Sequence, residues 1–178
     1  MNILFDRQII IKGKHAIYMD KLAKRNEPER VFNRLVDVYM LAPIVGYIYG
    51  KEEEEDNEIK EKRTIFTDVL NTERKNLKFI YQTLTLLIDS ENISSEERME
   101  RAFKDQYYQE ENNRHNENQD RFNRFLLGGI TYLHDRIIKD SLSYHEQLDR
   151  YHDFVKDFQL NIIEDSLNIE LNLDEIID

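Results

Sequence analysis

The residues best placed to do chemistry lie in the last third of the chain, where His145, Asp149 and His152 follow one another at helical spacing. Residues three and four positions apart share a helix face, so these side chains could together ligate a metal ion. A solvent-facing helix in a chain with 34% charged residues produces the same spacing by chance, and we favour that interpretation. No zinc-protease motif, serine-nucleophile motif or glycine-rich phosphate loop occurs. We therefore expect no catalytic residue, no metal and no cofactor.

Two other groups of polar residues invite a chemical interpretation. His134 and Asp135 could form an acid/base pair, but adjacent residues on a helix point in different directions, which argues against it. Arg121, Arg124 and Arg136 are interleaved with aromatic and apolar residues and could contact a phosphate backbone. In the simpler interpretation these arginines form the outer face of a helix whose apolar residues are core. Nucleic-acid contact stays possible, but no basic stripe supports it.

The composition restricts the class of protein that must position these residues. The chain has 178 residues with 40% hydrophobic content, ten Tyr and nine Phe, which is enough to bury a core in one domain. Two Pro and five Gly among many charged residues are typical of a protein built largely from helices. The absence of Cys excludes disulfides and thiolate metal ligands. Because no signal peptide or membrane-spanning run is present, we expect a cytoplasmic protein without membrane contact.

The net charge of −11 is concentrated in two segments. Five acidic residues follow one another from Glu52 to Asp56, and the chain has no Lys or Arg after Lys156. Once these five acids and the seven acids after Lys156 are set aside, the rest of the chain carries a charge near +1. We expect 51–62 to be a solvated acidic loop and 159–178 to be an acidic, apolar tail of a single domain that spans 1–178.

Apolar spacing predicts a mainly α protein, a compact helical bundle of about five helices with short β-strands at its ends. The predicted helices are a short one over 14–25, a central one over 28–49 that contains Pro43, and further ones over 71–88, from Ser94 or Ser95 to beyond Phe103, over 121–138 and over 141–158. Ser94 followed by Glu97 matches a capping box, and the helix that follows should bury Met99, Ala102 and Phe103.

Two consecutive glycines, Gly128 and Gly129, lie inside the helix predicted over 121–138. They cost about 2 kcal/mol relative to alanine, so something must compensate for them. Close packing against the central helix, which has its own small residues Ala42 and Gly46, is the simplest compensation.

Both ends of the chain show strand patterns. Gln8 to Lys12 is short and β-branched, and in the tail Leu167, Ile169, Leu171 and Leu173 alternate with polar residues that include Glu170. A two-stranded pair is marginal in water, so the tail either pairs with the N-terminal strand or adds to a strand of a partner chain. In the second case the acids would select a basic neighbour, and these tail residues would form the protein-interaction site.

Several patches of the sequence also resemble a known group of proteins. The patches are Lys14–His15, Asp37–Tyr47 with Gly50–Lys51, Arg63–Phe66 and Phe125–Gly129. In their order along the chain they resemble the small proteins associated with Dnd loci, the bacterial systems for DNA phosphorothioate modification and restriction. The resemblance implies an accessory component encoded among anti-phage defence genes, which acts beside a nuclease or ATPase that supplies the chemistry.

From these observations we expect a non-enzymatic accessory subunit of a bacterial anti-phage defence complex, which binds other protein subunits or a second copy of itself. One alternative is an acidic inhibitor that mimics DNA, and another is a cryptic metal-dependent enzyme. A DNA mimic requires acids in phosphate-like rows on a rigid surface, whereas this sequence concentrates its acids in a loop and a tail.

Overall fold

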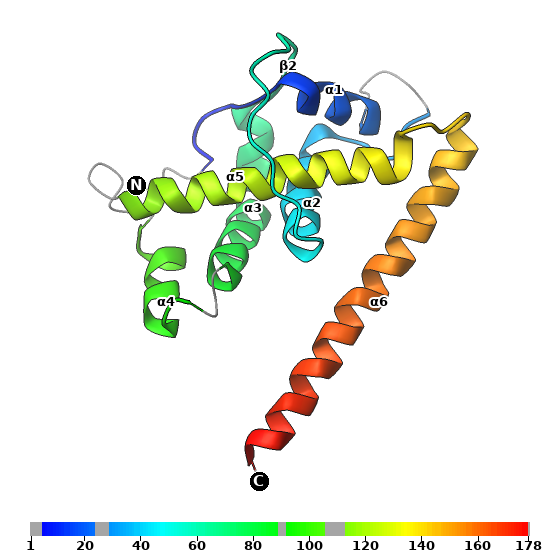
Figure 1. Cartoon of the computed structure of the whole chain (residues 1–178). Helices are drawn as coiled ribbons and strands as arrows, with labels where there is room; N and C mark the ends of the chain where they lie inside the picture. Colours follow the sequence, from blue (N-terminus) through cyan, green and yellow to red (C-terminus); the bar gives the residue numbers. More distant parts are fainter. Residues whose placement is uncertain (1–4, 24–28, 89–91, 106–112, 178) are drawn as a thin grey trace. The chain divides into compact units, whose positions relative to one another are not determined.

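The computed structural model describes residues 5–23, 29–88, 92–105 and 113–177, with the backbone alone for residue 113 and for 163–177. Contacts group the chain into two compact units, Met1–Asp135 and Arg136–Asp178. The order of elements is β1 (Ile9–Lys12), α1 (Gly13–Leu22), α2 (Leu35–Ile48), β2 (Lys62–Ile65), α3 (Thr67–Leu87), α4 (Ser95–Phe103), α5 (Asn113–Leu133) and α6 (Tyr144–Ile177) (Figure 1). A mainly α fold with short strands is thus confirmed.

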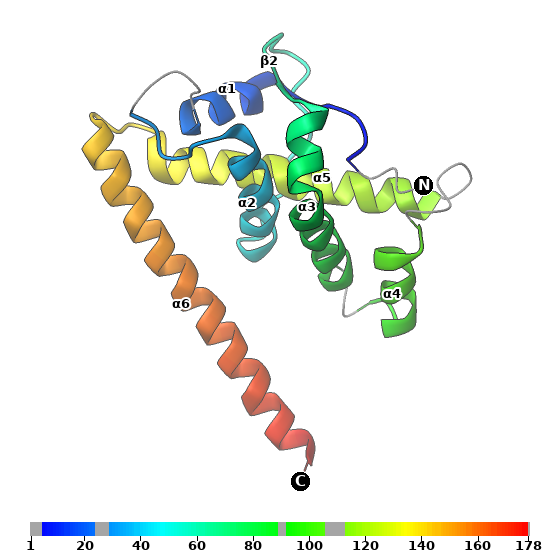
Figure 2. The same cartoon turned by 180° about the vertical axis from the view of Figure 1, so that it is seen from behind.

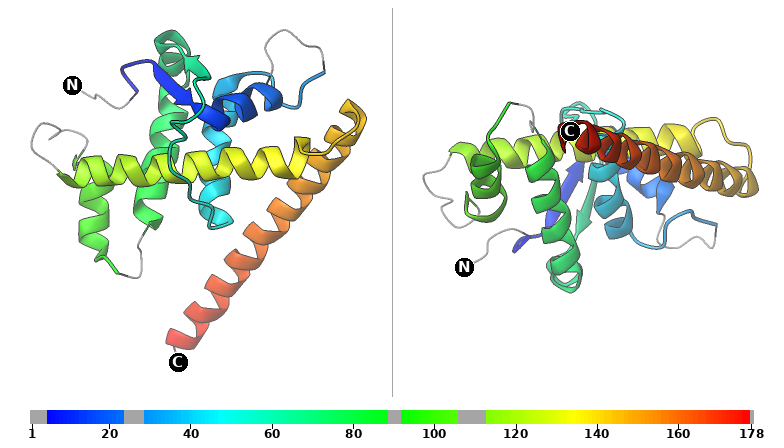
Figure 3. Two further views of the ribbon diagram at one scale, coloured as in Figure 1. Left: turned by 45° about the horizontal axis from the view of Figure 1, so that its top comes forward. Right: turned by 90° about the horizontal axis from the view of Figure 1, so that it is seen from below.

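β1 and β2 form a two-stranded antiparallel sheet in which Ile9 lies opposite Ile65 (Figure 3). The predicted N-terminal strand is confirmed, but its partner is Lys62–Ile65 and not the tail. This partner lies between the expected acidic loop and α3, where the sequence predicts no strand. Of the four residues of β2 only Ile65 is buried, so the strand lacks the apolar alternation by which strands are recognised.

α2 and α5 cross at small residues and form the centre of the first unit, and Figures 1 and 2 show α5 running across α2 and α3. A Cβ atom added at Gly46 would overlap the carbonyl group of Phe125, and one added at Gly129 would overlap the carbonyl group of Ala42. Three of the residues selected from the sequence as packing positions therefore meet at one crossing. Only glycine permits backbones to approach this closely.

The predicted central helix begins later than expected. Its proposed start, Pro28, lies outside the described residues, and residues 29–34 are not helical. α2 begins at Leu35, where Asp37 Oδ2 accepts the backbone N–H of Arg34 at 3.0 Å and the Arg34 guanidinium binds the same carboxylate. The capping carboxylate thus marks the true helix start, and Pro43 is accommodated inside the helix.

Three aromatic rings join α2, α3 and α5. The ring of Phe122 lies 6.5 Å from that of Tyr39 and 5.3 Å from that of Tyr81, measured between centroids. α4 begins as predicted, because Ser94 Oγ accepts the backbone N–H of Glu97 at 3.2 Å. Of the residues expected to be buried by α4, Ala102 is buried, whereas Met99 and Phe103 are exposed.

The tail is helical, and its strand prediction is wrong. α6 continues to Ile177, so Leu167, Ile169, Leu171 and Leu173 lie in a helix. Residues four positions apart also share a helix face, so the alternation divides into two helical pairs, 167 with 171 and 169 with 173. No Gly or Pro follows Gly129, and nothing therefore ends the helix that Ser143 caps through the N–H of Glu146. Within the described residues, no helix is long and apolar enough to cross a membrane.

Candidate functional site

The five acids Glu52–Asp56, here called the acidic strap, cross α5 on the way from α2 to β2 (Figure 1). The backbone N–H of Glu53 donates to the carbonyl of Arg124 at 3.1 Å. A Cβ added at Gly128 would overlap the carbonyl of Lys51. The absence of a side chain at Gly128 therefore lets the backbone at Lys51, just before the strap, pack directly against α5. Residues 51–61 are thus mostly exposed, as expected of a solvated loop, but the strap within them is held against α5.

Three of the outer acids of the strap pair with cationic side chains. Distances between charged atoms are 3.7 Å for Glu52 with Arg121, 2.9 Å for Glu54 with Arg124 and 2.7 Å for Glu55 with Lys12. The two arginines that the sequence suggested for nucleic-acid contact therefore face carboxylates of the same chain. Such pairing is the opposite of the exposed acidic rows that a DNA mimic requires.

Asp56 caps α1 from outside the helix. Its Oδ2 accepts the backbone N–H of Lys14 at 2.8 Å, and this bond, with that from the N–H of Glu58, lowers the pKa of the Asp56 carboxyl group. Gly13 has a φ of +66°, and a Cβ there would collide with Asp56. The glycine is therefore required both by the backbone conformation and by the close approach of the strap.

The centre of the strap reaches a fully buried histidine. Oε2 of Glu53 lies 2.8 Å from His15 Nε2, accepts the Thr131 hydroxyl at 3.0 Å and lies 2.8 Å from Lys14 Nζ. Burial lowers the pKa of His15, so its ring is neutral at pH 7 and donates from Nε2 to the carboxylate. Partial burial raises the pKa of Glu53, but hydrogen bonds from Lys14, His15 and Thr131 outweigh it and the net pKa is lowered. Nδ1 of His15 has no hydrogen-bond partner among the described residues.

A second histidine, His134, directly follows the end of α5 and lies close to α1. The ring of Tyr18 stacks on that of His134 with centroids 3.8 Å apart, and His134 Nδ1 lies 2.9 Å from Asp135 Oδ1. Neighbouring side chains on an α-helix diverge, which argues against an acid/base pair of His134 and Asp135, yet the two side chains lie within hydrogen-bond distance. His134 opens a π-helical turn, His134–Ile138, where α-helical spacing no longer applies. The histidine is buried beneath Tyr18, and neither cavity described below is lined by it.

A groove of about 570 Å³ opens beside the strap. Its lining includes β1, the strap residues Glu53–Glu55 and the α5 residues Asp120 and Arg124, above a floor that contains Tyr39 and Phe122. It is the larger of these two cavities, and sequence reasoning missed it because its lining comes from five separate segments.

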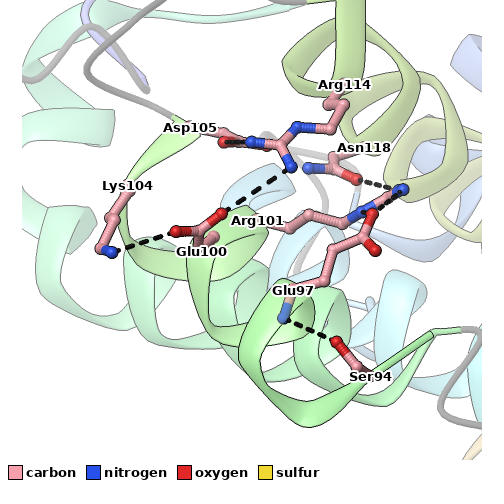
Figure 4. Close-up of polar contacts among 8 residues, drawn as sticks. All are labelled: Ser94, Glu97, Glu100, Arg101, Lys104, Asp105, Arg114 and Asn118. Atoms are coloured by element: carbon pink, nitrogen blue, oxygen red, sulfur yellow. Dashed lines mark hydrogen bonds and ion pairs between the residues drawn. The ribbon is translucent and has the colours of Figure 1, made fainter.

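The second cavity, of about 300 Å³, adjoins a polar cluster between α4 and α5 (Figure 4). In this cluster Arg101 donates to Glu97 at 2.8 Å and to Asn118 Oδ1 at 3.5 Å, and Arg114 donates to Asp105 at 2.9 Å. Figure 4 shows these side chains bridging the two helices. Arg101 and Asn118 also line the cavity.

Several buried atoms around the cluster lack a hydrogen-bond partner in the described part of the chain. They are the Tyr81 hydroxyl, Asp105 Oδ2, His115 Nδ1 and Asn118 Nδ2. Burial also lowers the pKa of His115.

The remaining candidates from the sequence lie in the second unit. His145, Asp149 and His152 are exposed on α6, and no group of three or more His, Asp or Glu side chains close enough to hold a metal occurs among the described residues. Arg136 pairs with Asp157 of the same unit. The side chains of 163–177 fall outside the described part, so Glu170 and the apolar tail residues are placed by the backbone of α6 alone.

Comparisons with known proteins add no relative: no family model, curated protein or solved structure matches this chain.

Proposed function

We propose that this protein is a non-enzymatic binding subunit of a protein complex and that α6 is its main recognition element. The observation that carries the proposal is the pattern of apolar residues along this helix of 34 residues. Residues spaced by three and four positions lie on one side of a helix. α6 has two such apolar stripes.

The long stripe runs along the whole helix. It consists of Tyr144, Leu148, Tyr151, Val155, Phe158, Ile162, Ile169, Leu173 and Ile176. The short stripe occupies the C-terminal half, on a nearly opposite side, and consists of Leu160, Ile163, Leu167 and Leu171. One flat surface covers only one side of a helix. The C-terminal half of α6 therefore fits a groove or a pair of partner surfaces, a common mode of helix recognition.

Charge indicates what kind of partner this is. After Lys156 the helix carries acids, Glu170 among them, and no Lys or Arg. A second copy of α6 would bring like charges together, whereas a partner with Lys or Arg around an apolar groove complements them. The resemblance to Dnd-associated proteins supports a partner among the proteins of a bacterial anti-phage defence system.

The test begins with the tagged full-length chain, purified gently from its own cells so that bound proteins can be identified by mass spectrometry. Affinity for the purified partner is then measured for two double variants, Ile169→Gln with Leu173→Gln and Leu167→Gln with Leu171→Gln. Each should weaken binding by about tenfold or more, because two apolar side chains lose their buried contacts. Binding should also weaken with increasing salt.

The matched control is Asn168→Gln with Asn172→Gln, on the polar side between the stripes, which should bind like the natural protein. Thermal unfolding of every variant establishes that the fold is retained. Unchanged affinity in both stripe variants would refute the role of α6. A partner whose contact surface is acidic would refute the charge argument.

A further inference from the structure

A separate feature of the first unit points to a second binding site. Within the part of the chain that the structure describes, β1 pairs with a strand on one side only. In antiparallel sheets, residue pairs that exchange backbone hydrogen bonds alternate with pairs that do not. The N–H of Gly13 donates to the carbonyl of Glu61 at 2.9 Å, which makes the odd-numbered positions of β1 the bonded ones. The N–H and C=O groups of Ile10 and the N–H of Lys12 therefore point away from β2, whereas the C=O of Lys12, the N-cap residue, accepts the first hydrogen bond of α1.

The groove of about 570 Å³ follows this open edge. Its lining includes all the residues from Gln8 to Lys12, and among the described residues none of β2 contributes. Successive strand residues point to opposite faces of a sheet, so a groove lined by every one of them lies along the edge and not over a face.

The chemistry of the groove favours an extended peptide with a cationic residue. The floor contains the apolar rings of Tyr39 and Phe122, and the acidic strap forms the opposite wall. Four carboxylates and three cationic groups line the groove. Glu53, Glu54 and Glu55 pair with Lys14, Arg124 and Lys12, so the remaining charged groups of the lining are Asp120 and Arg7. The carboxylate of Asp120 is exposed at its rim and pairs with no cation in the described part of the chain.

We propose that this groove binds an extended segment of another protein, which adds to β1 as a third strand. Backbone groups of the segment would bond Ile10 and Lys12, alternate apolar side chains would enter the floor, and a Lys or Arg would lie near Asp120. A third strand would also complete a sheet that is marginal with two. The edge is recessed between the strap and α5, which admits a single extended segment more readily than the sheet of a second folded copy.

A pair of proline substitutions in the full-length chain tests the proposal. Ile10→Pro removes only an N–H that points to the groove, and proline is tolerated at such an edge position. Thr64→Pro is the matched control, because Thr64 lies opposite Ile10 and its N–H points out from the other edge of the same sheet. Neither change removes a hydrogen bond between β1 and β2.

The probe is a displayed library of random peptides selected against the natural chain, from which the tightest binder is synthesised. Its dissociation constant should rise by about tenfold with Ile10→Pro and stay unchanged with Thr64→Pro, since one backbone hydrogen bond and the close approach are lost. Asp120→Asn should weaken binding of a peptide that carries Lys or Arg. The α6 variants described above should leave this peptide's affinity unchanged, which separates the two sites.

Amide hydrogen exchange supplies a readout that does not depend on the variants. Added peptide should slow exchange at Ile10 and Lys12 and leave Thr64 unchanged. Failure to select any peptide, equal affinity for the two proline variants, or protection at Thr64 alone would overturn the proposal. Sedimentation that shows a dimer through this edge, lost in Ile10→Pro, would identify a second copy as the occupant and would overturn the peptide assignment.

Discussion

One oxygen atom, Oε2 of Glu53, joins elements that are distant in the sequence. It meets His15 and Lys14 at α1 and the hydroxyl of Thr131 on α5. The Glu53 side chain is 27% exposed, whereas that of its neighbour Glu54 is 79% exposed and forms one ion pair. Two chemically identical neighbours therefore differ in how much they contribute to stability.

Glu53→Gln should lower the free energy of unfolding by about 2 kcal/mol, because a partly buried charged acceptor is lost while its donors remain. Glu54→Gln should cost less than about 0.5 kcal/mol, as exposed ion pairs do. Urea denaturation of the two variants at neutral pH measures both values. Equal decreases in the free energy of unfolding would show that the net negative charge of the strap holds it in place, and not the hydrogen bonds of Glu53.

The sequence therefore indicates which residues can form ion pairs, but it does not predict the residues with which they pair. The sequence suggests Arg121 and Arg124 as possible phosphate contacts and favours the outer face of a helix; in the structure they pair with carboxylates of the strap. No local pattern connects positions so far apart in sequence. The same limit hid the buried environment of His15.

At the scale of elements, the crossing of α2 and α5 was predictable because its signal is local. Glycines inside an amphipathic helix require an explanation, and the close approach of a second helix supplies it. β2 was missed because its residues are mostly polar, and the tail was misassigned because period-two spacing also fits two helical stripes. α6 is long because no Gly or Pro interrupts its sequence. A pattern search over a few residues of the tail does not detect this property of the whole segment.

Gly129→Ala should destabilise the protein by about 3 kcal/mol, since the added Cβ overlaps the backbone of α2 at Ala42 and Gly46. Gly50→Asn is the control. At Gly50 nothing lies within 4 Å of an added Cβ and φ is +59°, a conformation that Asn adopts readily. Thermal denaturation should show a large decrease in Tm for the first variant and a small one for the second. Equal decreases would show that the two helices can separate to accommodate a side chain.

At the scale of the whole molecule, stability should depend on pH through buried histidines. Burial lowers the pKa values of both His15 and His115, so the folded protein binds fewer protons than the unfolded chain, whose histidines titrate near 6.5. The stability associated with the neutral histidines is fully present above about pH 6.5. The free energy of unfolding then decreases as the pH falls towards the lowered pKa values of the folded state. The lowered pKa of Glu53 adds a further loss below about pH 4.5.

Urea denaturation between about pH 8 and pH 5.5 should therefore show a decreasing free energy of unfolding. The double variant His15→Gln with His115→Gln should be less stable at pH 8 but nearly independent of pH over this range. A natural protein whose stability is constant down to pH 5.5 would contradict the buried, neutral state of these histidines.

The acidic strap also determines when the first unit can finish folding during synthesis. Glu53 and its hydroxyl partner on α5 are separated by 78 residues. At about 5–20 residues per second, a ribosome needs on the order of ten seconds to make that stretch. Throughout this interval the strap has no α5 to bind, and the α2 surface around Gly46 is uncovered. The nascent chain therefore exposes its most apolar helix until α5 emerges, which makes this the period in which it most needs a chaperone.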